Sequence, residues 1–176
     1  MKIRRVVTGQ TSSGKSVFVH DDGVDPTTLS TLPGYEFHRL WGSDLPPALP
    51  TEGAPPAQPT YFPSTSGYRF GFFSLPPNTT HRDDPDPTSI LAEMATKLPG
   101  MAESMHPDGG GMHTTDTVDF DVVVSGEVWL ELDDGAEKLL KAGDCVVQNG
   151  TKHAWHNRSA APCVLAICLL GAKRAR

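Results

Sequence analysis

Short runs of apolar and β-branched residues, separated by turn signals, make up most of the second half of the chain. Six such runs follow one another, at residues 113–124, 127–133, 137–141, 144–148, 152–157 and 163–170. Dipeptides such as Ser125-Gly126 lie between them and supply hairpin turns. Strands of this length at this spacing predict an all-β sandwich or barrel.

The first of these runs separates polar from apolar residues by parity. Its odd positions are His113, Thr115, Thr117, Asp119 and Asp121, and its even positions from 118 onward are Val118, Phe120, Val122 and Val124. Successive side chains of a strand point to opposite faces, so one face of this strand is polar and the other packs. If the polar face lines a cavity, the apolar face requires cover from an N-terminal arm, a helix or another subunit.

The first half of the chain predicts an arm that lies outside the barrel. Short β-like runs at residues 3–7, 16–20 and 35–40 are separated by turns, and seven prolines fall within residues 43–63. Proline cannot donate a hydrogen bond to a sheet, so the proline-rich stretch is expected to be an extended connection. We therefore predict an N-terminal arm and connector over residues 1–63.

The predicted barrel begins with a strand at residues 68–75. Within residues 86–98 the apolar side chains recur at helical spacing after a proline that suits the first turn of a helix. We predict a barrel over residues 64–172, with a helical insertion around residues 87–98 and a basic tail at residues 173–176.

Composition and charge exclude several classes of protein. The chain has 176 residues, enough for one domain, and its net charge of −6 argues against binding the phosphate backbone of a nucleic acid. The sequence shows neither a run of 18 apolar residues nor an export signal, so we expect a cytoplasmic protein without membrane contact. Three cysteines in apolar runs predict reduced thiols and no disulfide framework.

One motif match is set aside. Residues 9–16 fit the spacing G-x-x-x-x-G-K-S of a phosphate-binding loop. Such a loop must open a helix, because the amides of the helix N-terminus hold the phosphates. The residues after Lys15 alternate like a strand and end in a turn, which favours a hairpin.

Two motifs in residues 111–171 point to a known family. In the first, His113 and Asp119 are followed, after six intervening residues, by Gly126; the second starts at Gly143 and includes His153 and Asn157. This arrangement resembles the two signature motifs of the cupin superfamily. The resemblance implies an antiparallel double-stranded β-helix, which is a jelly-roll barrel.

The resemblance also implies a metal site. His113, Asp119 and His153 match ligand positions of the family, whereas Thr115 replaces its second histidine and Gln148 replaces a proline of the second motif. Two imidazoles and one carboxylate suit a divalent transition metal, either iron, zinc, manganese or nickel. The alternative is a buried, hydrogen-bonded polar cluster without a metal.

Other residues are candidates for proton transfer or for the substrate pocket. Asp121 is expected to point inward, which requires a partner, a metal or a catalytic role unless a β-bulge turns it to solvent. His81 and His106 lie in loops that could close over the barrel mouth, so the catalytic candidates are Asp121, His106 and His81. The substrate pocket is predicted to contain Thr115, Trp155, Phe70, Phe72 and Asn157.

The expected function is that of an enzyme that acts on a small organic acid or carbonyl compound in the barrel. Lyase, dehydratase or isomerase chemistry is favoured over dioxygenase chemistry, since proton transfer does not require a redox metal. The alternative is a metal-free barrel that binds a small-molecule ligand. A homodimer is expected, because the apolar outer faces need cover.

Overall fold

The structure of the chain is a computed structural model, and it describes residues 2–80, 86–107 and 109–175. In chain order the elements are β1 (Ile3–Gln10), β2 (Ser16–Val24), β3 (Thr27–Thr28), β4 (Glu36–Ser43), β5 (Tyr68–Leu75), the 3-10 turn η1 (Asn78–Thr80), α1 (Pro87–Lys97), η2 (Ala102–Ser104), β6 (Thr117–Ser125), β7 (Glu127–Glu131), η3 (Asp133–Gly135), β8 (Glu137–Lys141), β9 (Cys145–Gln148), β10 (Ala154–His156) and β11 (Cys163–Gly171). Strands dominate, as the sequence predicts.

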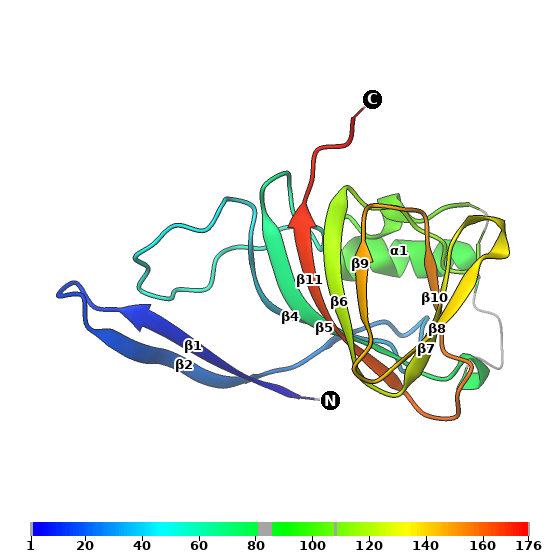
Figure 1. Ribbon diagram of the computed structural model, residues 1–176, viewed down its shortest axis with the longest axis horizontal. Helices are drawn as coiled ribbons and strands as arrows, with labels where there is room; N and C mark the ends of the chain where they lie inside the picture. The colour runs from blue at the N-terminus through cyan, green and yellow to red at the C-terminus, as the bar shows by residue number, and fades with distance from the viewer. Residues whose placement is uncertain (1, 81–85, 108, 176) are drawn as a thin grey trace.

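Two sheets form the barrel. The larger has the strand order β3-β4-β5-β11-β6-β9, and the smaller has the order β10-β7-β8. The pairs that build both sheets are antiparallel, with the C-terminal strand β11 between β5 and β6. Figure 1 shows the two sheets on either side of the barrel, with α1 seen behind β9 and β10 in this view. The fold is the antiparallel double-stranded β-helix that the motifs imply.

The N-terminal region divides into two parts. β1 and β2 form a separate hairpin that extends away from the barrel (Figure 1), whereas β3 and β4 extend the larger sheet next to β5. A hydrogen bond of 2.9 Å from the amide of Thr11 to the carbonyl of Lys15 closes the turn of the hairpin. Strand β2 begins at the next residue, Ser16. Lys15 therefore leads into a strand, which excludes the phosphate-loop interpretation.

Helix α1 begins as the sequence predicts. The carboxylate of Asp86 accepts hydrogen bonds from the amides of Thr88 and Ser89, and Pro87 occupies the first turn. The helix buries Met94, and Leu98 follows it into the same apolar cluster. None of the helices in the described part of the chain is long and apolar enough to span a membrane.

The outer face of the larger sheet stays open in the single chain. Phe70, Cys168, Phe120 and Val147 lie opposite one another in one row across β5, β11, β6 and β9. The exposed apolar side chains of this face are Phe70, Phe120, Val122, Val124, Val147 and Leu170. In the described part of the chain neither the hairpin nor α1 covers them.

The loop after β10 is tied to β5 by one buried side chain. The amide nitrogen of Asn157 donates to the carbonyls of Leu75 at 3.0 Å and Ala161 at 2.8 Å. Its oxygen accepts hydrogen bonds from the amide and the hydroxyl of Ser159. This asparagine is a structural residue, which corrects its assignment to the substrate pocket.

We expect Asn157→Ala to destabilise the protein by about 1–3 kcal/mol, because the buried carbonyl of Leu75 would lose the side-chain amide that donates to it. Differential scanning calorimetry would measure the loss as a lower Tm, and the exposed Asn149→Ala serves as the control. Equal Tm values for the two variants would contradict the structural role.

Candidate functional site

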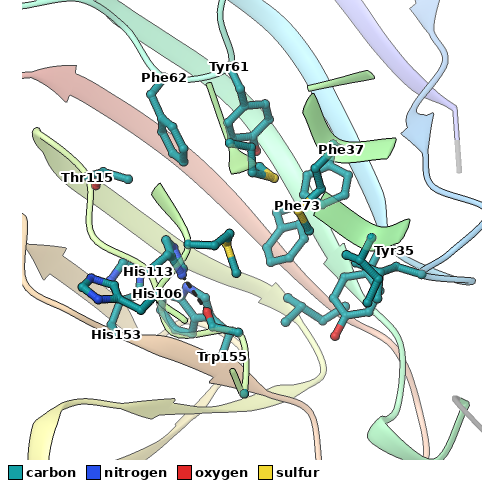
Figure 2. A pocket seen from close by; sticks show the side chains of 18 of the residues that line it. Tyr35, Phe37, Tyr61, Phe62, Phe73, His106, His113, Thr115, His153 and Trp155 are labelled. Carbon is teal, nitrogen blue, oxygen red and sulfur yellow. Dashed lines mark hydrogen bonds between the residues drawn. The ribbon is translucent and has the colours of Figure 1, made fainter. Parts of the chain in front are cut away.

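A cavity of about 830 Å³ lies inside the barrel. Its wall combines residues of both sheets, of α1 and of the loop before β6. Histidines gather with Trp155 on one side, and the aromatic rings of Tyr35, Phe37, Tyr61, Phe62 and Phe73 lie on the other (Figure 2). A cavity of this volume is large enough for a small-molecule ligand.

The histidine side of the cavity is built by a backbone bridge. The amide of His113 donates to the carbonyl of His153 at 2.9 Å, and the reverse hydrogen bond is 3.0 Å long. The bridge holds the two imidazole rings with their centroids 4.1 Å apart. Two histidines separated by 40 positions in the sequence thus become neighbours, as the two motifs predict.

In both rings Nδ1 is hydrogen-bonded to a backbone carbonyl, which leaves Nε2 available to bind a ligand. Nδ1 of His113 lies 2.9 Å from the carbonyl oxygen of Gly111, and Nδ1 of His153 lies 3.0 Å from that of Thr151. A carbonyl oxygen only accepts, so each neutral ring carries its proton on Nδ1 and keeps a lone pair on Nε2. Burial lowers the pKa of both rings, to about 4 for His153, where His113 adds to the effect.

Two carboxyl groups face the same cavity from β6. Asp119 and Asp121 are each only 5% exposed and both line the cavity, so Asp121 points inward and no bulge turns it to solvent. Burial raises the pKa of Asp119 to about 6. Burial also raises the pKa of Asp121 to about 7, and the neighbouring charge of Asp119 adds to the shift.

The other predicted site residues are distributed between the cavity and the surface. Thr115 and Trp155 line the cavity, and the hydroxyl of Thr115 lies 2.7 Å from that of Thr117. His106 also lines it, with Nε2 2.8 Å from the hydroxyl of Thr114. His81 lies outside the described residues.

Phe70 and Phe72 do not line this cavity, which corrects their assignment to the substrate pocket. The odd positions of β5 face the interior, so Phe73 and Leu75 form the wall instead. Phe70 is 43% exposed on the outer face. The sequence Phe70-Gly71-Phe72-Phe73 contains aromatic residues of both parities, so the pattern alone did not decide which ring points inward.

Sequence reasoning missed several lining residues, among them an aromatic pair of the connector and a histidine of β10. Tyr61 and Phe62 come from the proline-rich connector, and their rings meet edge to face at 5.0 Å. His156 also lines the cavity although its parity predicts the opposite face, and its Nε2 lies 2.6 Å from a carboxylate oxygen of Glu131. An aromatic pair within a proline-rich stretch was the available signal for the connector.

One further cluster could hold a metal ion. Among the described residues, Glu131, Glu137 and His156 bring one ligand atom each to within 4.8 Å of one another. The ligand atoms of the predicted set, His113, Asp119 and His153, do not meet this 4.8 Å spacing among the described residues. Arg158 already binds both carboxylate oxygens of Glu137, so this cluster is also an ion-pair network.

Curated proteins match the chain over 46 to 48 residues each. It is 52% identical over 48 residues to Phomopsin biosynthesis cluster protein D of Diaporthe leptostromiformis, which covers 27% of this chain and 25% of that protein. Oryzines biosynthesis cluster protein J of Aspergillus oryzae is 53% identical over 47 residues, covering 27% and 26%. The cupin-domain-containing oxidoreductase virC of Hypocrea virens is 39% identical over 46 residues, covering 26% and 24%. The matches span about a quarter of these relatives, and no family model matches.

Solved structures that resemble the chain include cupins of low sequence identity. The putative ethanolamine utilization protein Q of Salmonella typhimurium aligns with a TM-score of 0.45 at 10% identity, over 98% of this chain and 99% of that chain. An RmlC-like cupin with a double-stranded β-helix from Methanocaldococcus jannaschii gives 0.40 at 15%, over 61% and 73%. A sugar phosphate isomerase of the cupin superfamily from Silicibacter pomeroyi gives 0.43 at 15%, over 80% and 62%. Their functions do not transfer to this chain.

The carboxyl groups predict how stability depends on pH. In the folded chain both aspartates have a pKa above the usual 3.8, so the folded state holds more protons between about pH 4 and pH 7. Their contribution to stability therefore falls as the pH rises through that window. We expect Asp121→Asn to gain Tm relative to the wild type as the pH rises from about 4 to about 8.

Calorimetry across that pH range would measure the difference between the two proteins. Asp134→Asn, at an exposed position, is the matched control and should show a constant difference from the wild type. A Tm difference for Asp121→Asn that is independent of pH would show that this carboxyl is not held in an apolar site.

Proposed function

We propose that this chain is a cupin enzyme whose active site is the barrel cavity, where it acts on a small organic molecule. The observation that carries the proposal is the composition of one side of the cavity. Two imidazoles with free Nε2 atoms and two buried carboxyl groups share a wall that is otherwise largely apolar. Groups of this kind are costly to bury and are concentrated at functional sites.

Each polar group has a distinct role in this proposal. Asp121 is the proton-transfer group, because it faces the cavity and can hold a proton on its carboxyl oxygen or accept one from a substrate carbon or hydroxyl. His106 is a second candidate, with Nε2 beside the hydroxyl of Thr114. The apolar wall excludes water, which strengthens the electrostatic contacts within the site.

The donor atoms fit a divalent metal in their chemistry. Nε2 of His113 and Nε2 of His153 keep their lone pairs, and Oδ1 of Asp119 is buried without a hydrogen-bond partner. These three residues would hold iron, zinc, manganese or nickel. A bound ion would supply Lewis-acid polarisation of a substrate carbonyl, or a site for oxygen chemistry.

Proton-transfer chemistry, as in a lyase, dehydratase or isomerase, is the favoured reaction class. It is supported by the two carboxyl groups, which can move protons without a redox step. The oxidoreductase name of the relative from Hypocrea virens supports dioxygenase chemistry as the competing class. The second candidate function is a metal-free barrel that binds a ligand, which the predominantly apolar wall favours.

Metal analysis tests the proposed centre. We expect the untagged protein to carry close to one equivalent of a divalent transition metal, and His113→Ala and His153→Ala each to lose most of it, because each removes one nitrogen ligand. His20→Ala, on the N-terminal hairpin, is the control and should retain the metal. Elemental analysis by mass spectrometry gives the metal content.

Two results would contradict this centre. A content below about a tenth of an equivalent would favour the metal-free barrel over the metalloenzyme. Loss of the metal in His156→Ala, with retention in His113→Ala, would place the ion at the cluster of Glu131, Glu137 and His156 instead.

The exposed outer face supports a homodimer. A contiguous apolar row on β5, β11, β6 and β9 is costly to leave in water, and a second copy offers an identical apolar surface. We propose that two chains pair through this face of the larger sheet.

Light scattering after gel filtration would test the pairing. We expect a dimer for the wild type and a monomer for Phe120→Asp, because a charge would be buried at the centre of the face. Leu132→Asp, in the exposed connection after β7, should remain dimeric. A wild-type monomer at high micromolar concentration would overturn the proposal.

A further inference from the structure

The described part of the cavity wall contains acidic side chains but no lysine or arginine. Among the described residues that line it, the acidic ones are Asp119 and Asp121, and none is lysine or arginine. A carboxylate or phosphate ligand would therefore enter a site that already holds two acidic groups and, among the described lining residues, has no lysine or arginine to pair with it. In a low-dielectric site this arrangement opposes the binding of an anion.

Two arginines of the larger sheet, the buried Arg69 and the half-buried Arg39, bind groups outside the cavity. Arg69 is 4% exposed and binds the carboxylate of Asp44 at 2.6 Å. Arg39 donates to the backbone carbonyls of Gln58 and Thr60. Neither arginine lines the cavity, and their hydrogen bonds hold the proline-rich connector against the sheet.

The conclusion applies to the site without a metal ion. A bound divalent cation would be the largest local charge and could offer an open position to an anionic oxygen, so the comparison between acid and alcohol is made on the metal-free protein.

The remainder of the wall is suited to an apolar body. The rings of Phe37 and Phe73 stack at 5.0 Å, and those of Tyr35 and Phe73 at 6.0 Å. Met94, Met101 and Met105 complete the apolar part, and methionine side chains adapt to irregular shapes. The volume of about 830 Å³ exceeds what a small sugar or a short acid would fill.

We propose that the cavity selects an uncharged, largely apolar molecule that carries a carbonyl or hydroxyl group. Its body lies against the aromatic and methionine side chains, and its oxygen faces the imidazoles and carboxyl groups, which supply hydrogen bonds. The inference rests on the proposed function of the cavity and narrows its substrates. The sequence leaves two substrate classes open, small organic acids and carbonyl compounds. Under this proposal carbonyl compounds remain candidate substrates, whereas organic acids and phosphate esters do not.

Four probes with the same phenyl-and-chain body test the selection: phenylpropanol, benzylacetone, phenylpropionate and phenylpropylamine. Isothermal titration calorimetry would measure their affinities for the full chain after treatment with a chelator. We expect the alcohol and the ketone to bind at least about tenfold more tightly than the acid in the chelator-treated protein.

Two matched variants locate the binding. Leu91 on α1 is 40% exposed and lines the cavity, whereas Leu132 is 36% exposed and does not line it. Leu91→Trp should weaken binding of the alcohol at least about tenfold by filling part of the cavity, and Leu132→Trp should leave it unchanged. Both positions are accessible to solvent, so a larger side chain is compatible with folding.

Each remaining outcome overturns a defined part of the account. If the acid or the amine binds as tightly as the alcohol, and Leu91→Trp still weakens binding, the uncharged class is wrong while the cavity stays the site. If none of the four probes binds, or if Leu91→Trp has no effect, the cavity is not the binding site. That result would overturn the proposed function together with this inference.

Discussion

The alternation of side chains along β6 is the constraint on which the rest of the structure depends. Odd positions carry Thr117, Asp119 and Asp121 into the barrel, and even positions carry Phe120 and Val122 to the outer surface. A strand fixes both faces at once, because a shift of one residue would exchange them. The same alternation therefore produces both the polar cavity and the exposed apolar face. A substitution that shifted the register of β6 would alter both faces together.

The sequence predicted the strands of the barrel, the helix and the inward direction of Asp119, because each depends on local periodicity. For Asp121 the sequence left a β-bulge equally open, and the structure places this side chain inward. The sequence also placed His113 beside His153, since the two motifs imply adjacent strands. It failed where periodicity carries no information. Strand β5 has aromatic residues at both odd and even positions, so its pattern did not show that Phe73 is the ring that points inward. Strand β4 pairs with β5 in the larger sheet, although its residues were assigned to the arm.

The chemistry of the site follows from an imbalance between burial and charge. Asp119 and Asp121 have no lysine or arginine beside them among the described lining residues, so burial raises the pKa of both carboxyls. We propose that the same lack of lysine and arginine favours an uncharged ligand. In that proposal, burial raises the pKa of the carboxyls toward neutral pH, where they can transfer protons, and also disfavours an anionic ligand.

A crystal structure of the untagged protein with phenylpropanol tests the central claim, that the barrel cavity is the functional site, most directly. The account predicts the phenyl ring among Phe37, Phe73 and the methionines, with the hydroxyl toward His113 and His153. Ligand density confined to the outer face around Phe120, with only solvent in the cavity, would contradict it.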